Sequence, residues 1–391
     1  MRVAHLADAH LGFRQFQRLA PDGVNQREAD VAAAFRRAVD AIIARGVDAT
    51  VIAGDLFHAV RPTNRSIIEA FGQLNRLRRE LPLAPVILIA GNHDTPRSSE
   101  AGSILKLMTS LGVDVVDDET RQLEYPDIGL SVLAVPHAAL LRDPARNWRP
   151  PPGARHSMLV LHPEIDGFFP DYGESDFGGV RVSVEELGAD WDYVALGHYH
   201  VTTRVAARAW YSGSLEYTSP NLWGEWRLER DKGASKGILI ADLEARTVEH
   251  VALKSQRVIH DLPALDASGM TAQALDAAIQ GRVAGVAGGI ANTVSRLLVW
   301  NVPRELAHGL DHGAIRSLRA QALHFQLDLR RPEIHRYSAG GAPSSRLPLA
   351  ELVAEYLSRR PLDADLDRTR LVALGREYLD LVDREMAESG A

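Results

Sequence analysis

Cysteine is absent from this chain of 391 residues. Disulfides, thiolate nucleophiles and cysteine-based zinc or iron–sulfur sites are therefore excluded. Lysine is also scarce, with only four residues, so that arginine carries nearly all of the basic charge. No apolar run is long enough to cross a membrane, and the first residues, with Asp8 and two histidines, do not resemble a signal peptide. These absences predict a cytoplasmic protein.

The overall charge gives no sign of a nucleic-acid-binding protein. There are 44 basic and 51 acidic residues, and the formal net charge is −7. Net charge describes local patches poorly, so this does not exclude such a function. Apolar residues make up 46% of the chain, which excludes disorder throughout. The length fits two or three folded units.

The first part of the chain alternates apolar runs with helical patterns. Runs at Val3–Ala7, Ala49–Ala53 and Val86–Ala90 predict strands. Between them, apolar residues recur at helical spacing; Gly46 is expected to end the first helix and Thr63 to begin the second. This β-α-β-α-β order predicts an α/β fold with parallel strands.

Further along, the pattern changes three times. From about Leu123, strand-like runs follow one another closely and indicate a second set of strands. The expected members of this set are Leu130–Val135, Met158–Leu161, Tyr193–Leu196, Gly237–Ala241 and Thr247–Leu253. We expect a first domain over 1–257, a small α+β cap domain over 258–338, a linker rich in Gly, Ala, Pro and Ser over 339–345, and a helical tail over 346–391.

Five of the apolar runs end in polar clusters. These are Asp8-Ala9-His10, Gly54-Asp55-Leu56-Phe57-His58, Gly91-Asn92-His93-Asp94, His162 and Gly197-His198-Tyr199-His200. Ligands of α/β sheets gather beyond the carboxyl ends of the strands, so five separate segments are expected to point polar side chains at one place. The three glycines are expected to let the backbone turn sharply off each strand.

The residue types in these clusters favour a metal centre. Imidazole and carboxylate together suit ions such as Mn, Fe or Zn, whereas an all-oxygen set suits Mg or Ca. The candidate ligands exceed the needs of one tetrahedral ion and fit two ions that share a carboxylate. A lone Asp is commonly a helix cap and a lone His a buried structural residue, but five strand ends in one order favour the metal centre. The candidates are Asp8, His10, Asp55, Asn92, His162, His198 and His200.

The ordered set resembles the calcineurin-like metallophosphoesterase superfamily. Its pattern of D-x-H, G-D, G-N-H-D, a strand-terminal His and G-H-x-H occurs here in full, over roughly residues 1–255. Within the superfamily the chain is most similar to the SbcD nucleases, bacterial relatives of the meiotic-recombination-eleven DNA repair nuclease. Three segments carry that similarity: Arg2–Gly12, Gly54–His58 and Tyr211–Leu215.

The resemblance implies a four-layer α-β-β-α sandwich and a role for each site residue. One metal would be held by Asp8, His10, Asp55 and His200, and the other by Asp55, Asn92, His162 and His198, with Asp55 as the bridge. His93 would stabilise the transition state and help to protonate the leaving oxygen. Asp94 would orient His93, and His58 is a further candidate catalytic residue. Water activated by the metals would be the nucleophile.

The resemblance also implies a function and partners. These are Mn-dependent hydrolysis of phosphodiesters in DNA, as exonuclease and endonuclease, in double-strand break repair or end processing. The expected partners are DNA, an SbcC-like coiled-coil ATPase and a second copy of the chain. The helical tail would bind the ATPase through the stripe Leu371, Leu374, Tyr378 and Leu381, although a stripe of this kind can equally pack on its own domain.

Two other functions stay open at this point. A protein of the same fold could hydrolyse nucleotides or other small phosphate esters. A non-catalytic scaffold for an ATPase is the third reading, although a scaffold has no need for a full set of ligands for two metals. Turnover of duplex DNA, compared with that of small esters, would separate the first two.

Overall fold

The computed structural model describes residues 1–96, 102–142, 146, 148–168, 179–188, 190–332, 353–354, 356–357 and 367–389, of which 376 and 380–389 are described by their backbone alone. By its internal contacts the chain divides into two compact units, Met1–Pro332 and Glu333–Ala391. The expected linker at 339–345 lies outside the described residues, and the expected domain limits stay predictions.

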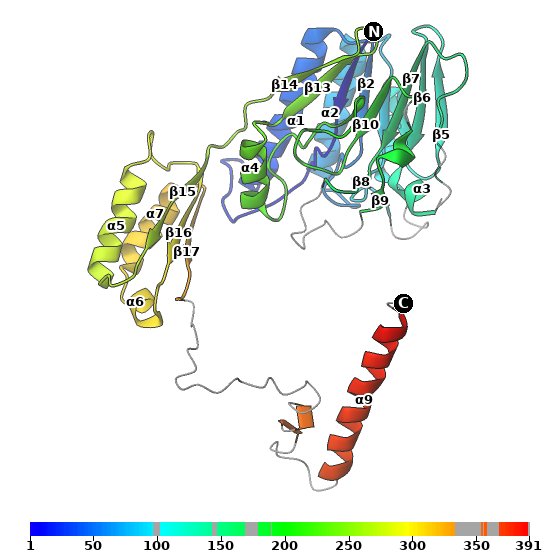
Figure 1. Ribbon diagram of the computed structural model, residues 1–391. Coiled ribbons are helices and arrows are strands. Elements are labelled where there is room, and N and C mark those ends of the chain that lie inside the picture. The colour runs from blue at the N-terminus through cyan, green and yellow to red at the C-terminus, as the bar shows by residue number, and fades with distance from the viewer. Residues whose placement is uncertain are drawn as a thin grey trace. The chain divides into compact units, whose positions relative to one another are not determined.

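The first sheet of the larger unit is mixed and has six strands (Figure 1). In spatial order these are β14 (Thr247–Ala252), β13 (Gly237–Asp242), β1 (Arg2–Leu6), β2 (Ala49–Ala53), β3 (Val86–Ile89) and β4 (Val113–Val116). β1 to β4 run parallel, and β13 joins the edge of β1 in the antiparallel direction. The two runs that become β13 and β14 were expected in the second set of strands; that expectation is wrong, because β13 completes the open edge of β1.

The second sheet also has six strands and is mixed. Its order is β11 (Thr203–Arg204), β12 (Ala209–Tyr211), β10 (Tyr193–Leu196), β7 (His156–Leu161), β6 (Leu130–Val135) and β5 (Arg121–Tyr125). β6, β7, β10 and β12 run parallel, and the edge strands β5 and β11 run antiparallel to their neighbours. The carboxyl ends of the central strands therefore lie along one edge of this sheet, as they do in the first.

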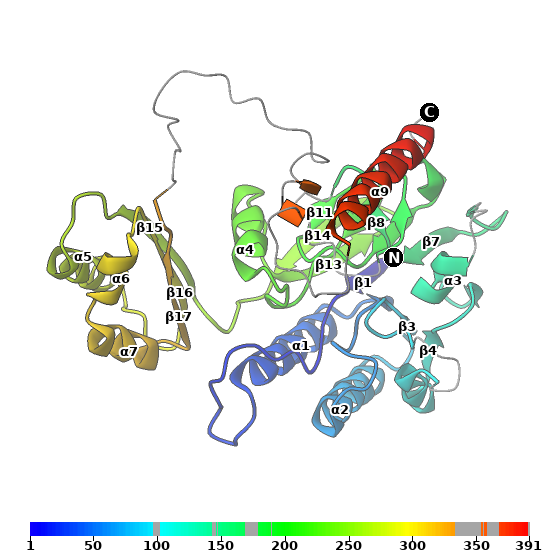
Figure 2. The same ribbon diagram turned by 90° about the horizontal axis from the view of Figure 1, so that it is seen from below.

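Helices cover the outer face of the first sheet (Figure 2). Asn25 begins α1 (Gln26–Arg45) by accepting hydrogen bonds from two backbone amides, and Gly46 ends it with φ of 54°. The side chain of Thr63 accepts a hydrogen bond from the amide of Ser66 and begins α2 (Asn64–Glu80), as expected. The short helix η2 (Ile104–Leu111) follows and precedes β4.

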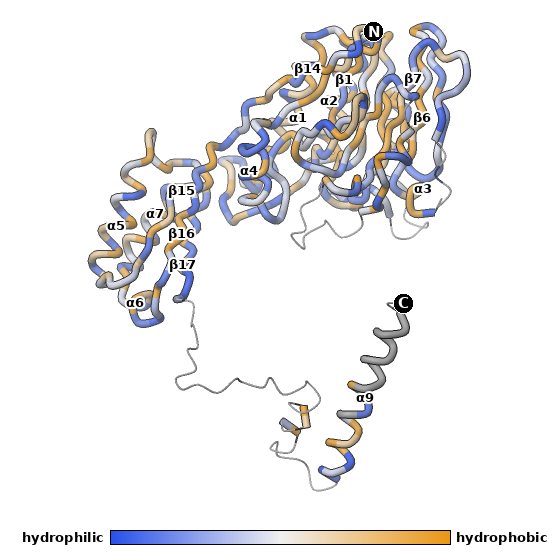
Figure 3. The backbone as a smooth tube through the Cα atoms, viewed as in Figure 1, coloured by the Kyte–Doolittle hydropathy of each residue, from blue (hydrophilic) through white to orange (hydrophobic). Residues whose placement is uncertain are grey.

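The main core lies between the two sheets and on both of their outer faces. Along β2, Val51 faces the second sheet, while Ile52 packs under α1 and α2. Leu159 and Leu161 of β7 face outward, with Leu140 of α3 (His137–Arg142) packed near them. Figure 3 shows hydrophobic residues concentrated along the strands. Burial on both faces explains why β1, β2 and β3 read as continuous apolar runs.

A small third sheet lies C-terminal to these elements. Its strands are parallel, in the order β15 (Ile259–Asp266), β16 (Val294–Trp300) and β17 (His324–Leu329). α5 (Ala272–Ala284), α6 (Arg304–His308) and α7 (His312–Gln321) accompany it, and together they enclose a separate hydrophobic core. The fold is thus α/β, with two large mixed sheets and a small extra sheet.

Short elements lie along the chain between the strands of the two large sheets. They are β8 (Glu164–Ile165), β9 (Arg181–Val182), η3 (Glu185–Leu187) and α4 (Leu222–Asp231). α4 contacts the small sheet, because Arg227 of α4 pairs with Asp261 of β15. Near the start of the small sheet, Arg257 forms two hydrogen bonds to the buried carboxylate of Asp30 in α1.

The smaller unit contains α9 (Arg368–Ser389). Arg368 donates a hydrogen bond to the carbonyl of Leu357, so α9 contacts the segment that precedes it. Leu374 is 46% exposed and Tyr378 is 63% exposed. Among the described helices of the whole chain, none is long and apolar enough to cross a membrane.

Candidate metal centre

The carboxyl ends of the parallel strands from both sheets meet at one place. β1, β2 and β3 end there from the first sheet, and β7 and β10 end there from the second. The backbones come very close: a Cβ added to Gly197 would overlap the carbonyl oxygen of Ala53 and lie 2.6 Å from Nδ1 of His162. Residues that follow five strands are thereby held within reach of one another.

Two groups of carboxylate and imidazole atoms form at this meeting point. One contains Asp8, His10 and His200, and the other contains Asp8, Asp55 and His162. Within each group the ligand atoms lie within 4.8 Å of one another. All five residues are buried, with at most 9% of their surface exposed. Buried clusters of this kind can hold metal ions, and Asp8 belongs to both.

Asp55 also lies between the two groups. Its Oδ2 is 3.2 Å from Nε2 of His162 and 3.8 Å from Nε2 of His10. Its Oδ1 accepts a hydrogen bond of 2.9 Å from the backbone amide of His93, which fixes the rotation of the carboxylate. One oxygen of Asp55 thus faces imidazoles of both groups, as a bridging ligand requires.

Asn92 and His198 complete the set. The side-chain oxygen of Asn92 lies 3.1 Å from Nε2 of His162 and 3.1 Å from Nδ1 of His198. The backbone amide of His198 donates to both carboxylate oxygens of Asp8, at 3.0 and 3.1 Å. The structure therefore brings all seven of the predicted ligands together, and their assignment to individual ions stays a prediction.

The second ring nitrogen of three histidines faces an acceptor outside the cluster. Nδ1 of His162 is 2.7 Å from the carbonyl of Ala53, Nε2 of His198 is 3.2 Å from Glu164, and Nδ1 of His200 is 3.8 Å from Glu225. Metal-bound histidines ordinarily have such an outer partner, which fixes the tautomer and turns the other nitrogen to the ion. The donor set and its surroundings therefore fit two divalent ions.

The backbone is strained at four of the seven predicted ligands. Asp8, His10, Asp55 and His198 have φ of 52°, 47°, 51° and 97°. Non-glycine residues rarely adopt this left-handed region, and such strain persists mainly where surrounding structure enforces it, often at functional sites. Here the strain turns each side chain sharply off its strand and into the cluster.

The three glycines of the motifs serve two different purposes. Gly54 has φ of 95° and makes the turn that was expected of it. Gly91 does not have positive φ, but a Cβ there would lie 2.7 Å from the backbone nitrogen of Asp55. At Gly91 and Gly197 φ is not positive, and glycine is needed because another strand end, with the predicted ligands Asp55 and His162, leaves no room for a side chain.

Burial and the charges of neighbouring side chains shift the pKa values of the cluster residues in opposite directions. Burial raises the pKa of Asp8 and lowers the pKa of His10 well below its usual value. Burial alone would raise the pKa of Asp55, but His162 outweighs it and holds this pKa well below the usual range. For His162, Asp55 outweighs burial and raises the pKa to about 9. Metal ligands bind deprotonated, so a cation would compete with a proton at these residues.

His93 and His58 lie beside the cluster. The ring of His93 is 4.9 Å from that of His10 and stacks on His58 at 5.2 Å. Nδ1 of His93 donates a 2.8 Å hydrogen bond to the carbonyl of His58, which fixes the ring. Asp94, which was expected to orient this ring, accepts hydrogen bonds from the amides of Leu56, Phe57 and Gly91. These bonds hold the backbone at Leu56, Phe57 and Gly91, and the expected role of Asp94 in orienting the His93 ring stays a prediction.

Sequence reasoning missed three buried residues near the cluster. Glu164 and Glu225 are the outer partners described above, and no motif marks them. His137 directly follows β6, so the strand-end pattern could have found it. Its backbone amide donates to Ala90, its Nδ1 is buried without a hydrogen-bond partner, and burial lowers its pKa to about 4.

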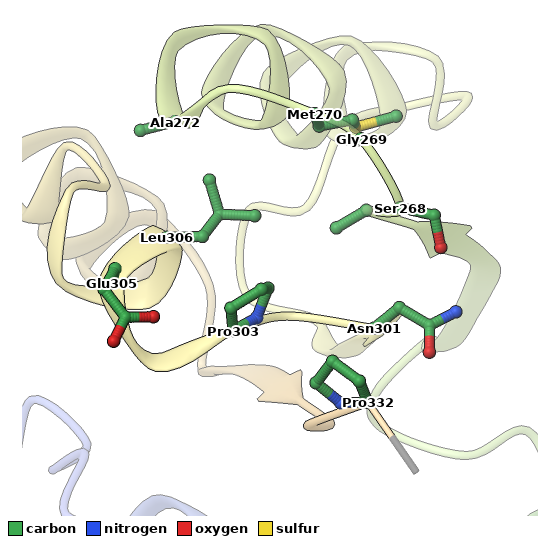
Figure 4. A pocket seen from close by; sticks show the side chains of 10 residues that line it. Ser268, Gly269, Met270, Ala272, Asn301, Pro303, Glu305, Leu306 and Pro332 are labelled. Carbon is green, nitrogen blue, oxygen red and sulfur yellow. The ribbon is translucent and has the colours of Figure 1, made fainter. Parts of the chain in front are cut away.

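A cavity of about 730 Å³ lies elsewhere, beside the small sheet (Figure 4). Ser268, Met270, Asn301, Glu305 and Pro332 are among the residues that line it. It contains one carboxylate and no histidine, so it lacks the chemistry of the strand-end cluster. The candidate metal centre is identified by its ligands and not by cavity size.

Comparisons with known proteins point to the same region. A family described as Calcineurin-like phosphoesterase matches residues 1–202. A DNA double-strand break repair protein Mre11 from Thermoplasma acidophilum is 29% identical over 266 residues, which cover 65% of this chain and 65% of that protein. A protein of the same name from Sulfurisphaera tokodaii is 28% identical over 62% of this chain and 59% of its own length. Another, from Haloferax volcanii, is 31% identical over 56% of this chain and 46% of its own length. The chain thus spans less than two thirds of the length of these curated relatives.

Proposed function

Because this chain belongs to the calcineurin-like phosphoesterase family, we propose that it is a DNA nuclease that hydrolyses phosphodiester bonds at a dinuclear metal centre. The observation that carries the proposal is the position of Asp55, whose Oδ2 faces imidazoles of both ligand groups. DNA as substrate is supported by relatives named as double-strand break repair proteins. The core is proposed to be a four-layer α-β-β-α sandwich. The protein is proposed to act in the cytoplasm.

The chain's residues divide the work at this centre. Asp8, His10, Asp55 and His200 would hold one ion, and Asp55, Asn92, His162 and His198 the other. Mn²⁺ is the proposed metal, as the resemblance to the SbcD nucleases implies; the mixture of imidazoles and carboxylates fits it and also fits Fe or Zn. Two such ions lower the pKa of water and offset negative charge on the phosphodiester.

His93 is proposed to move the proton. Its Nδ1 is held by a carbonyl, which can only accept, so the proton on Nδ1 stays there and Nε2 is the atom that gains or loses one. A protonated Nε2 can donate a hydrogen bond to a phosphate oxygen. It can then transfer that one proton to the leaving oxygen, which leaves the ring neutral. His58 stacks on this ring and restricts its movement.

Digestion of end-labelled duplex DNA with Mn²⁺, with and without chelator, tests the proposal. Fragments that appear only with the metal are expected. Release of mononucleotides from a labelled end would indicate exonuclease cleavage, and longer fragments cut inside the duplex would indicate endonuclease cleavage. Cyclic nucleotides and a simple aryl phosphodiester serve as competing substrates. Hydrolysis of these small esters while the DNA stays uncleaved would favour the small-ester enzyme. The absence of metal-dependent hydrolysis of any substrate would favour the scaffold.

Replacement of His93 by alanine is expected to separate chemistry from metal binding. Turnover should fall by ~10²–10⁴-fold, the usual contribution of a positioned acid or base. Bound metal should be unchanged, because His93 is outside the proposed ligand set. Elemental analysis and single-turnover cleavage measure the two quantities. Wild-type turnover, or loss of metal, would show that His93 does not have this role.

The tail is proposed to bind a coiled-coil ATPase of the SbcC type. Leu374 and Tyr378 are exposed apolar residues on α9, and the tail forms a unit apart from residues 1–332. Leu371 is half-buried, and Leu381, the fourth predicted contact, has no described side chain. A homodimer also stays a prediction.

Deletion of residues 346–391 should abolish capture of the co-expressed ATPase and leave metal-dependent cleavage of small substrates intact. The ligands all lie in other segments, so the chemistry does not need the tail. A double variant, Leu374→Glu with Tyr378→Glu, should also lose the ATPase without shortening the chain. Unchanged capture by either variant, or unfolding of the remaining domain, would favour self-packing of the tail.

A further inference from the structure

A buried group of charges lies directly behind His200. Glu225 of α4 is 6% exposed and Lys236 is 3% exposed, and the two side chains form an ion pair. The other carboxylate oxygen of Glu225 is 3.8 Å from Nδ1 of His200. Nε2 of the same ring lies 3.0 Å from Nε2 of His10, inside the ligand cluster. One imidazole thus connects this charge pair to the proposed metal centre.

The pair also holds the backbone of His200. Nζ of Lys236 donates 2.9 Å hydrogen bonds to the carbonyl of His200 and to the hydroxyl of Ser214. The hydroxyl of Ser214 is within 3.2 Å of Glu225, and the amide of Ser219 donates to the second oxygen of Glu225 at 3.1 Å. The carboxylate therefore has little freedom to turn away from the ring.

A buried ion pair is a poor source of stability. Desolvation of the two charges offsets most of their attraction, and an apolar pair of similar volume would often be at least as stable. A carboxylate aimed at the outer nitrogen of a metal-bound histidine has a separate effect. It fixes the tautomer, orients the ring and makes the ligating nitrogen more basic. Orientation of the His200 ring, and not stability, accounts for the position of Glu225.

We propose that Glu225, held in place by Lys236, is a positioning residue for His200: its carboxylate lies on the Nδ1 side of the ring, and Nε2 then faces the ligand cluster, where the metal would bind. This inference rests on the proposed function, because it requires a metal at His200. Glu225 is not among the proposed ligands. Loss of Glu225 should therefore lower the affinity for the metal, and any loss of cleavage should follow from that.

The helix supplies its own matched control. Glu229 lies one turn beyond Glu225, is likewise buried, and is 3.6 Å from the same lysine. Its second carboxylate oxygen accepts a hydrogen bond from the hydroxyl of Tyr217, and its described contacts do not include His200. Replacing either glutamate by glutamine removes one buried charge beside Lys236. Only the change at Glu225 removes the carboxylate that faces the ligand.

The test is titration of the metal-free full-length protein with Mn²⁺ by calorimetry, with unfolding in urea measured on the same samples. Glu225→Gln is expected to weaken one of the two binding events by ~10–100-fold, the usual effect of removing such an outer partner. Glu229→Gln should bind within about twofold of the parent protein. Glu225→Asp, which restores a carboxylate, should recover part of the loss.

Equal Mn²⁺ affinity of Glu225→Gln and the parent would overturn the proposal, as would equal losses in Glu225→Gln and Glu229→Gln. If Glu225→Gln does not fold, the double variant Glu225→Gln with Lys236→Met removes both charges and carries the test. This double variant should fold and should bind one of the two ions more weakly than the parent protein does. Binding of both ions with the affinity of the parent would overturn the proposal. A parent protein that binds no Mn²⁺ would instead refute the metal centre itself.

Discussion

The Asp55→Ala variant should lose DNA cleavage by ~10²–10³-fold or more and should bind much less metal than the parent protein. Asp55 is buried, its Oδ2 faces His162 and His10, and its Oδ1 accepts the amide hydrogen of His93. One substitution therefore removes the proposed bridge between two ions and releases the turn that carries His93. Elemental analysis after gel filtration, with cleavage assays at saturating Mn²⁺, measures both losses.

Asp30 offers a control for loss of a buried carboxylate. It is 2% exposed and binds Arg257 and Arg27, away from the ligand cluster. Asp30→Asn is expected to lower the free energy of unfolding while metal content and cleavage stay near those of the parent. Two ions still bound to Asp55→Ala would contradict the proposed bridging role.

The Gly197→Ala variant is expected to be less stable than the parent protein and to bind metal less tightly, because the added methyl group has no room. The added methyl group would overlap the carbonyl of Ala53 and crowd the ring of His162, and backbone cannot move aside as a flexible side chain can. Overpacking of this kind costs ~1–3 kcal/mol of unfolding free energy or more. Displacement of Gly197 also moves the amide of His198 away from Asp8, so metal affinity should fall as well.

Gly72 provides the matched substitution. It lies on the exposed surface of α2, and no atom would lie within 4 Å of an added Cβ. Gly72→Ala should therefore stabilise the protein by ~0.5–1 kcal/mol, because alanine favours the helix. Urea unfolding curves of both variants give the comparison. A Gly197→Ala protein as stable as the parent and with full metal content would show that the two sheets do not approach as closely as described.

The local pattern of the sequence was sufficient for most elements that carry ligands. The strand at Ala49–Ala53 has the predicted limits, and Thr63 and Gly46 cap the predicted helices. These features depend on neighbours in the chain: apolar residues buried on both faces of a strand, a side chain that accepts from a nearby amide, a glycine in left-handed conformation. A short segment of sequence contains all the residues on which such features depend, so they can be predicted from it.

The sequence by itself determined which residues follow the strands, and so the full set of candidate ligands from Asp8 to His200. Tertiary structure decided what could not be read along the chain. β13 joined the first sheet because β1 had an open edge, and Glu225 came to face His200 because α4 packs behind that strand end. Gly197 is needed because Ala53, from the other sheet, lies against it. Such contacts join distant segments, and their geometry exists only after both sheets have packed.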